Sequence, residues 1–304
     1  MGSIGVQLLD EPIAERLDPR ARVYVVDRLS PGATIHRLIG VSNTTRSTVD
    51  VVLYAAAATI GDGSFLGSVG HAPDPLSSWT TVTPSSAAIP PGGDIQASVT
   101  VEVPPDAAPG EQYAVVWAQT QSAPNTDGGV IQVNRVGIRL YVSVGAGAAP
   151  ASNFTINSLT AERTTTGKQL LVAEVHDTGG RAVDLSGSLQ LSDGPGGLST
   201  GRLPVTLGVT LGIGQTEPVS VPIATEIPDG PWKARLTLHS GLLTRSGTAT
   251  ITFPNAGAAP PATVSMARPG PRRWVIAAAV LMLFAALVTV VRRARRGHGR
   301  SMVG

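Results

Sequence analysis

The sequence predicts an all-β fold, with two tandem immunoglobulin-like β-sandwiches followed by one C-terminal transmembrane helix. Short segments of alternating apolar and polar residues recur through residues 4–254, separated by Pro and Gly and almost free of helical periodicity. Evenly spaced short strands of this kind are typical of β-sandwiches. A later run, residues 274–291, contains no charged residue, as expected of a membrane-spanning helix.

The first sandwich is expected over residues 4–144. Its main strand candidates are residues 22–29, 34–42, 49–58, 94–103, 111–120 and 130–144. Tyr113 follows a Pro/Gly-containing loop near the start of one candidate, where a large aromatic residue usually fills the end of the core. Residues 145–150 consist of Gly, Ala and Pro and are expected to form a linker.

The second sandwich is expected over residues 151–254. Its strand candidates are residues 154–163, 169–177, 185–192, 216–223, 233–240 and 248–253. Trp232 occupies the position that Tyr113 has in the first sandwich, and we expect it to fill the second core. Residues 255–271 are rich in Ala, Pro and Gly, which predicts a semi-stiff stalk.

The predicted membrane anchor is a helix over residues 274–291, about 27 Å long at about 1.5 Å per residue. Trp274 lies where an interfacial aromatic residue belongs. Arginines stand on both sides of the run, and those that follow it begin a basic tail over residues 292–304: Arg292, Arg293, Arg295 and Arg296. A buried core helix is the alternative, but it would seldom lack a polar stripe.

Charge predicts the topology of this anchor. Residues 1–267 carry 15 Lys and Arg against 21 Asp and Glu, a net charge of −6, and residues 268–304 hold the other eight basic residues. The excess of arginine after residue 291 favours a cytoplasmic C-terminus and an extracytoplasmic body at the plasma membrane. No signal peptide is evident from Met1, so either the start lies within a longer precursor or the body is cytosolic and tail-anchored.

Several classes of function are disfavoured by the residues present. The acidic body lacks the basic stripe that nucleic-acid binding needs. Without cysteine, disulfides and thiol chemistry are excluded. The histidines lie outside metal-ligand spacing, and neither a nucleophile elbow nor a phosphate-binding loop occurs. The sequence therefore predicts a protein that is not an enzyme and has neither a metal nor a cofactor.

Residues 61–79 interrupt the regular series of strands and form the candidate ligand-binding loop. This glycine-containing segment holds carboxylate, imidazole and aromatic side chains: Asp62, Phe65, His71, Asp74 and Trp79. Long loops on sandwiches often carry recognition, because the sheets hold them in place. The alternative is a solvated loop in which Trp79 is buried at the start of the next strand.

An ordered series of short motifs in residues 4–144 resembles the N-terminal domain of the WxL-interacting proteins of Gram-positive bacteria. These motifs are Tyr24-Val-Val-Asp27, Pro31-Gly32, Val41-Ser-Asn43-Thr44, Ala55–Thr59, Ile89-Pro-Pro-Gly92, Val101-Glu-Val-Pro104 and Gly110-Glu-Gln-Tyr113 with Trp117. Lys occurs only at 168 and 233 while Arg is abundant, a composition typical of a high-GC, actinobacterial member.

The resemblance implies a non-enzymatic cell-surface protein that binds peptidoglycan of the cell wall through the first sandwich. It also implies that the second sandwich is presented to surface-protein partners. A structural or scaffold subunit of a membrane complex, with no glycan ligand, is the main rival, and a cytosolic tail-anchored adaptor is the third interpretation. The ligand-contacting residues are not transferred by the resemblance.

Overall fold

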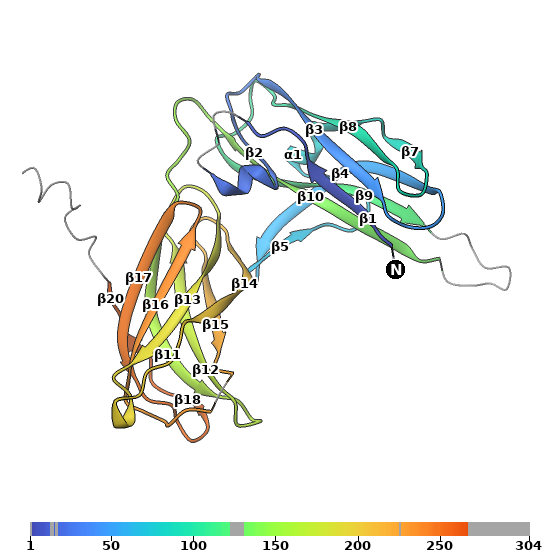
Figure 1. Ribbon diagram of the computed structural model, residues 1–304. Helices are drawn as coiled ribbons and strands as arrows, with labels where there is room; N and C mark the ends of the chain where they lie inside the picture. The colour runs from blue at the N-terminus through green and yellow to red at the C-terminus, as the bar shows by residue number, and fades with distance from the viewer. Residues whose placement is uncertain (1, 13–14, 16–17, 122–130, 225, 267–304) are drawn as a thin grey trace, which may run out of the picture. The chain divides into compact units, whose positions relative to one another are not determined.

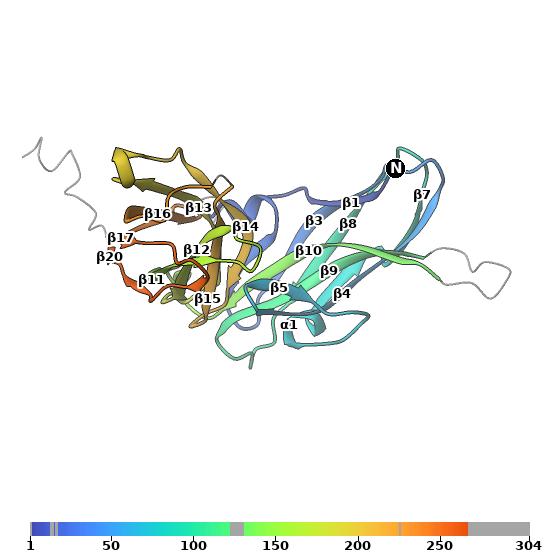
Figure 2. The same cartoon turned by 90° about the horizontal axis from the view of Figure 1, so that it is seen from below.

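The computed structural model describes residues 2–12, 15, 18–121, 131–224 and 226–266. Among these residues strands dominate, and the helices are the four-residue α1 (Pro75–Ser78) and the short 3-10 helices η2 (Pro19–Arg22) and η3 (Pro195–Gly197). The predicted all-β fold with two immunoglobulin-like sandwiches is confirmed (Figures 1 and 2). Residues 1–266 form one compact unit.

The predicted membrane helix at residues 274–291 and the basic tail lie outside the described residues. None of the helices that the structure does describe is long and apolar enough to cross a membrane.

The first sandwich has one four-stranded and one six-stranded sheet. The four-stranded sheet has the order β1 (Ile4–Leu8), β3 (Thr34–Asn43), β8 (Asp94–Glu102) and β6 (Thr80–Thr83). The six-stranded sheet has the order β2 (Val25–Leu29), β10 (Val133–Val144), β9 (Gly110–Gln121), β4 (Val49–Gly61) and β5 (Ser64–Gly67), and β7 (Ser86–Ile89) also pairs with β4. The β2–β10 pair is parallel, whereas the other pairs are antiparallel.

The core of the first sandwich follows from alternation along its strands. In β8, Ala97, Val99 and Val101 are buried while the residues between them face outward. Because successive side chains of a strand point to opposite faces, this pattern fixes which face packs against the other sheet. Val116 of β9 and Leu140 of β10 supply part of the opposing apolar layer.

The second sandwich also consists of two sheets. One has the order β15 (Thr216–Pro222), β12 (Gln169–Asp177) and β11 (Phe154–Arg163), with β18 (Gly257–Ala258) and β19 (Ala262–Thr263) along the free side of β11. The other has the order β14 (Leu203–Leu211), β13 (Val183–Ser192), β16 (Trp232–Ser240), β17 (Leu243–Ile251) and β20 (Ser265–Met266).

The two aromatic residues expected to fill the cores have different surroundings. Trp232 is 1% exposed within the second core, and its indole Nε1 donates a hydrogen bond of 2.7 Å to the carbonyl oxygen of Pro228. Tyr113 instead packs beside Tyr141 and Phe65 in a separate cluster. The position is therefore predicted correctly for Trp232, whereas Tyr113 lies outside the main core of its sandwich.

Several segments contain more regular structure than the sequence pattern predicts. Strands β6, β7 and β14 are not among the expected strands, residues 61–79 contain β5 and α1, and the expected stalk contains β18, β19 and β20. Asp62 and Gly63 join β4 to β5 in a tight turn with φ values of 48° and 67°. An Asp-Gly pair with two positive φ angles suits a two-residue hairpin turn. The boundaries assigned to the linker and stalk stay predictions.

Candidate functional site

The first sandwich has an open edge on the side where β1 faces β10. Strand β10 pairs with β9 from Val133 to Val144, but on its other side β2 covers only Leu140–Val144. Residues 133–139 of β10 therefore have no strand on that side among the described residues. Strand β1, in the other sheet, pairs with β3 and is likewise an edge strand. The two strands approach each other across the sandwich (Figure 1).

A groove with a volume of about 450 Å³ lies at this open edge. Its apolar lining comes from Ile4, Val49, Ala118 and Val136. Three of these side chains, those of Ile4, Val49 and Val136, are only partly buried although they pack against the core of the sandwich. Arg135 is the single charged residue among those lining the groove, and most of the others carry hydroxyl or amide groups. We call this feature the edge groove.

The corresponding edge of the second sandwich is closed by the chain itself. After β17, residues 257–266 return along the gap: β18 and β19 pair with β11, and β20 pairs with β17. These residues lie within the segment expected to form a stalk. Ala259, Ala262 and Val264 pack against the second core, and Val264 lies over Gly247. We call residues 257–266 the strap.

The contrast between the two sandwiches indicates what the edge groove can accommodate. A strand edge presents unpaired N–H and C=O groups that can pair with another extended segment. In the second sandwich an extended segment with small and β-branched residues fills the gap between the sheets. The first sandwich offers the same two kinds of contact. Residues 133–139 offer backbone hydrogen bonds, and the partly buried side chains of the groove offer apolar packing.

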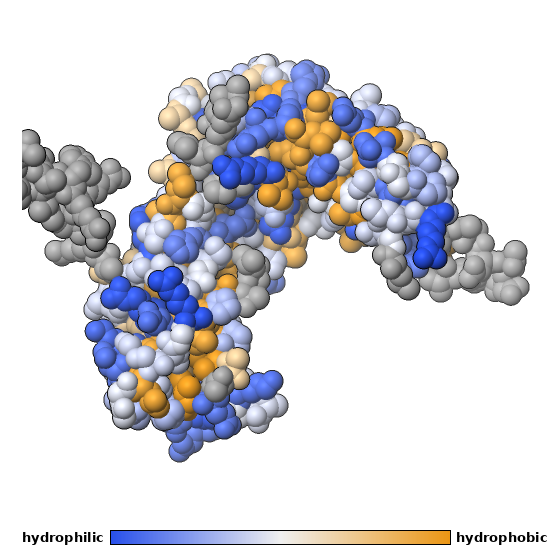
Figure 3. Space-filling model, viewed as in Figure 1, coloured by the Kyte–Doolittle hydropathy of each residue, from blue (hydrophilic) through white to orange (hydrophobic). Residues whose placement is uncertain are grey.

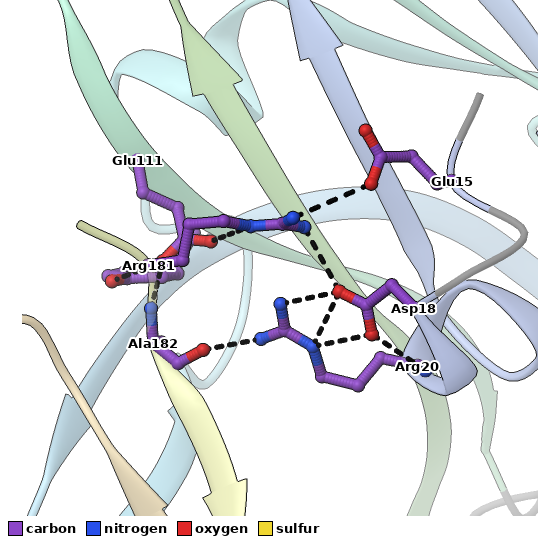
Figure 4. Close-up of polar contacts among 7 residues, drawn as sticks. Glu15, Asp18, Arg20, Glu111, Arg181 and Ala182 are labelled. Atoms are coloured by element: carbon purple, nitrogen blue, oxygen red, sulfur yellow. Dashed lines mark hydrogen bonds and ion pairs between the residues drawn. The ribbon is translucent and has the colours of Figure 1, made fainter. Parts of the chain in front are cut away.

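The two sandwiches meet at a buried polar junction (Figure 4). Arg20 of η2 binds the carboxylate of Asp18 through Nη2 at 2.8 Å and donates a hydrogen bond from Nη1 to the carbonyl oxygen of Ala182 at 2.7 Å. Arg181 contacts the same carboxylate at 3.0 Å and Glu15 at 3.5 Å. Burial alone would raise the pKa of Asp18, but its bonds to Arg20 outweigh this and hold the pKa below its ordinary value.

Two further carboxylates in this region, those of Glu111 and Asp177, have raised pKa values. Glu111 accepts a hydrogen bond of 2.6 Å from the backbone N–H of Ala182, and its side chain is 1% exposed. Burial raises the pKa of Glu111, although that hydrogen bond opposes the shift. Asp177, at the end of β12, is also buried, which raises its pKa to about 6, although its bond from the N–H of Gly179 opposes the shift. One oxygen of each carboxylate has no hydrogen-bond partner among the described atoms.

The five residues predicted to bind a ligand in residues 61–79 have separate local roles. Asp62 forms the turn after β4, and Phe65 packs against Tyr141 beneath the guanidinium group of Arg139. His71 is exposed and stacks on Tyr54 with ring centroids 3.8 Å apart.

The other two predicted residues flank α1. Asp74 caps this helix by accepting a hydrogen bond of 2.7 Å from the N–H of Ser77. Trp79 follows α1 and packs, partly buried, against the core of the first sandwich. The binding role assigned to these residues stays a prediction.

Sequence reasoning missed the edge groove and the polar junction. The groove depends on which strand edge is left uncovered, and the sequence does not encode that locally. The junction joins residues more than 160 positions apart, as in the Arg20–Ala182 bond. Glu15 and Asp18 lie in a short segment that carries no motif to single it out.

Comparison with known proteins gives similarity in structure alone. No protein-family model matches the chain, and no curated protein matches it in sequence. The SafB chaperone of Salmonella enterica, in complex with SafA pilin, has 12% identity, a TM-score of 0.44 and coverage of 87% of this chain and 96% of that chain. The YadV chaperone has 12% identity, a TM-score of 0.41 and coverage of 82% and 99%. The CupB2 chaperone of Pseudomonas aeruginosa has 14% identity, a TM-score of 0.40 and coverage of 76% and 97%.

The predicted relationship to WxL-interacting proteins is wrong. No family model supports it, and the solved structures that resemble the chain include chaperones of Salmonella enterica and Pseudomonas aeruginosa. The motifs that suggested the family, such as Pro-Pro-Gly and Asn-Thr, are turn formers that any β-sandwich can use, so their order does not identify a family. The predictions of a Gram-positive, actinobacterial cell-surface protein and of peptidoglycan in the cell wall as its ligand fall with it.

The predicted location and partners are also wrong, because they depended in part on the family assignment. An anchored plasma-membrane protein with a membrane partner finds no support in the described helices or in the chaperones that resemble the chain. The rival interpretation, a scaffold subunit of a membrane complex, and the expected surface-protein partners are equally unsupported. Those inferences depended on residues 274–291 and on the family resemblance, not on the geometry of the sandwiches.

Proposed function

We propose that this chain is a binding protein, not an enzyme, and that it accepts an extended segment of a partner protein as an added β-strand in the edge groove. The single observation that carries the proposal is the contrast between the sandwiches. In each sandwich a gap between the two sheets lies where the first strand faces the last long strand, and the strap fills it in the second sandwich. In the first, β2 covers only part of β10, and a groove remains.

The chemistry of the groove defines the segment that would fit. Backbone groups along residues 133–139 of β10 would pair with it, whatever its sequence. Ile4, Val49 and Val136 would contact every second side chain, which favours small or β-branched residues such as those of the strap. A neutral or weakly acidic segment suits the single charge of Arg135.

Capture of an extended segment is the work of an assembly chaperone or a similar protein-binding module. Solved structures that resemble the chain include a chaperone bound to a pilin and a chaperone complex with a tip adhesin. Because their TM-scores are below 0.5, the proposal rests on the groove and not on these similarities.

A peptide-binding experiment on the full chain tests this function. The probe is a labelled nine-residue peptide of alternating Val and Thr with an uncharged Gly-Ser tail, and its control carries N-methyl groups on alternate amides, which removes the donors for strand pairing. Val136→Arg and Asn134→Arg place a bulky charge in the groove, and Val133→Arg introduces the same charge on the opposite face of β10. Val136 packs on the core, whereas Asn134 is exposed, so the second variant tests the groove without a folding defect.

We expect saturable binding of the unmethylated peptide, measured by fluorescence anisotropy. Binding should be lost in Asn134→Arg and Val136→Arg and kept in Val133→Arg. Equal binding of the methylated peptide, or equal binding by all three variants, would contradict strand addition at this groove.

A further inference from the structure

The second sandwich carries a basic hollow on the outer face of its β14-β13-β16-β17 sheet. The hollow has a volume of about 460 Å³ and is lined by Ser188, Gln190, Arg202, Arg235, Thr237 and His239. Figure 3 shows strongly hydrophilic residues gathered over β13, β16 and β17. This site is separate from the edge groove, which belongs to the first sandwich.

The charge of the hollow differs from that of the rest of the chain. Its lining has two arginines and no carboxylate, whereas residues 1–267 carry a net charge of −6. Arg202 and Arg235 are exposed, and within the described part of the chain neither forms an ion pair. By contrast, Lys233 on the same strand pairs with Asp193 at 3.7 Å.

The opposite sheet of the sandwich has the reverse character. Its strands β11 and β12 place Glu162 and Glu174 on the outer face. The second sandwich therefore separates charge between its two faces, and the basic one is hollowed. Charge separation of this kind guides association with a partner of opposite sign.

The strand register places the two guanidinium groups on either side of Gln190. Gln190 of β13 is opposite Arg235 of β16. On the other side of β13, Leu189 is opposite Leu203, so Arg202 lies next to Gln190 at the start of β14. With neighbouring strands about 4.8 Å apart, the two arginine backbones are about 10 Å apart across the sheet.

We propose that this hollow binds an extended acidic segment of a partner protein. Arginine is suited to this role, because its planar guanidinium group can bind a carboxylate through two hydrogen bonds. Alternate side chains of an extended segment repeat about every 6.7 Å, so two successive carboxylates on one face can reach Arg202 and Arg235. The hydroxyl groups of Ser188 and Thr237 lie opposite each other, two residues further along β13 and β16, and can donate further hydrogen bonds.

The test uses the full chain and a labelled hepta-glutamate peptide, with hepta-glutamine as the uncharged control. Arg202→Gln and Arg235→Gln each remove one charge from the hollow. Lys168→Gln removes the same charge from an exposed turn outside it. All three positions are exposed, so thermal melting should be unchanged and any loss of binding can be assigned to the surface.

We expect hepta-glutamate to bind and hepta-glutamine not to bind. Each arginine variant should weaken the binding of hepta-glutamate about three- to fivefold, and Lys168→Gln should leave it unchanged. Binding should also weaken as salt rises. An equal loss in Lys168→Gln would indicate a non-specific charge effect and overturn the proposal. Displacement by an equimolar amount of inorganic phosphate would also overturn it, since the hollow would then be a small-anion site. Asn134→Arg should leave this binding intact, which separates the proposal from the edge groove.

Discussion

Arg20 of the first sandwich donates a hydrogen bond from Nη1 to the carbonyl oxygen of Ala182 in the second, over a distance of 2.7 Å. The same guanidinium group is held by Asp18, and the neighbouring Arg181 contacts that carboxylate from the other side. The side chain of Arg20 is 8% exposed. This network links the two sandwiches through charge-assisted hydrogen bonds that are shielded from water.

We therefore expect Arg20→Ala to be strongly destabilising. The substitution leaves the buried carbonyl of Ala182 without its donor and removes one of the two cations beside Asp18. Breaking a buried pair by removing one partner typically lowers the free energy of unfolding by about 3–5 kcal/mol. Urea denaturation measures the effect, and Arg46→Ala, at an exposed position, should change stability by less than about 0.5 kcal/mol. Equal stability of the two variants would show that the junction contributes little.

The raised pKa of Asp177 implies that the stability of the chain depends on pH. Its pKa is about 6 in the folded chain and about 3.8 as the ordinary value, so the folded state holds more protons between these limits. Stability from this group is therefore fully present below pH 4 and is lost as pH rises through 6. Glu111, whose pKa is also raised, acts in the same direction. Melting of Asp177→Asn should show a shallower decline between pH 4 and 7 than the native chain, and an unchanged slope would refute this assignment.

Gly247→Ala should loosen the strap. A methyl group at this position would lie 2.4 Å from Cγ1 of Val264, which holds the strap on the second core. Overpacking of this kind typically lowers stability by about 1–3 kcal/mol. Gly201 offers a matched control, because a methyl group there meets nothing within 4 Å. The effect can be followed by chemical denaturation and by faster proteolysis within residues 257–266, and identical behaviour of the two variants would argue against a packed strap.

The substitution Trp79→Ala tests whether this side chain packs in the core or binds a ligand, as predicted for residues 61–79. Because Trp79 packs against the first core and is only partly buried, we expect a loss of about 3 kcal/mol, near the lower end for removal of a large aromatic side chain. His71→Ala, which removes an exposed ring stacked on Tyr54, should cost at most about 1 kcal/mol. An unchanged melting temperature for Trp79→Ala would restore the binding interpretation.

Sequence patterns predicted the sandwiches because alternation is a local property. β16 buries Trp232, Ala234, Leu236 and Leu238, and the same alternation is visible in its sequence. The strap could not be predicted in this way. Its strands are two residues long, and they exist because the distant β11 and the preceding β17 offer unpaired edges.

The candidate sites likewise divide into features that local sequence suggested and features that depend on pairing between distant strands. Composition drew attention to residues 61–79, where Asp74 in fact caps a helix and Phe65 packs under Arg139. The edge groove results from the length of β2 relative to β10, and the basic hollow from the register of β13 and β16. Both depend on pairing between distant strands, so a reading of local motifs does not reveal them.

Backbone hydrogen exchange along β10 tests strand addition most directly. The full chain is saturated with the alternating Val/Thr peptide, and exchange is compared with that of the free chain. Residues 140–144 already pair with β2 and provide an internal reference. We predict slower exchange at those amides of residues 133–139 that point away from β9, and no change at residues 140–144. Unchanged exchange at residues 133–139 while the peptide is bound would contradict the proposed function.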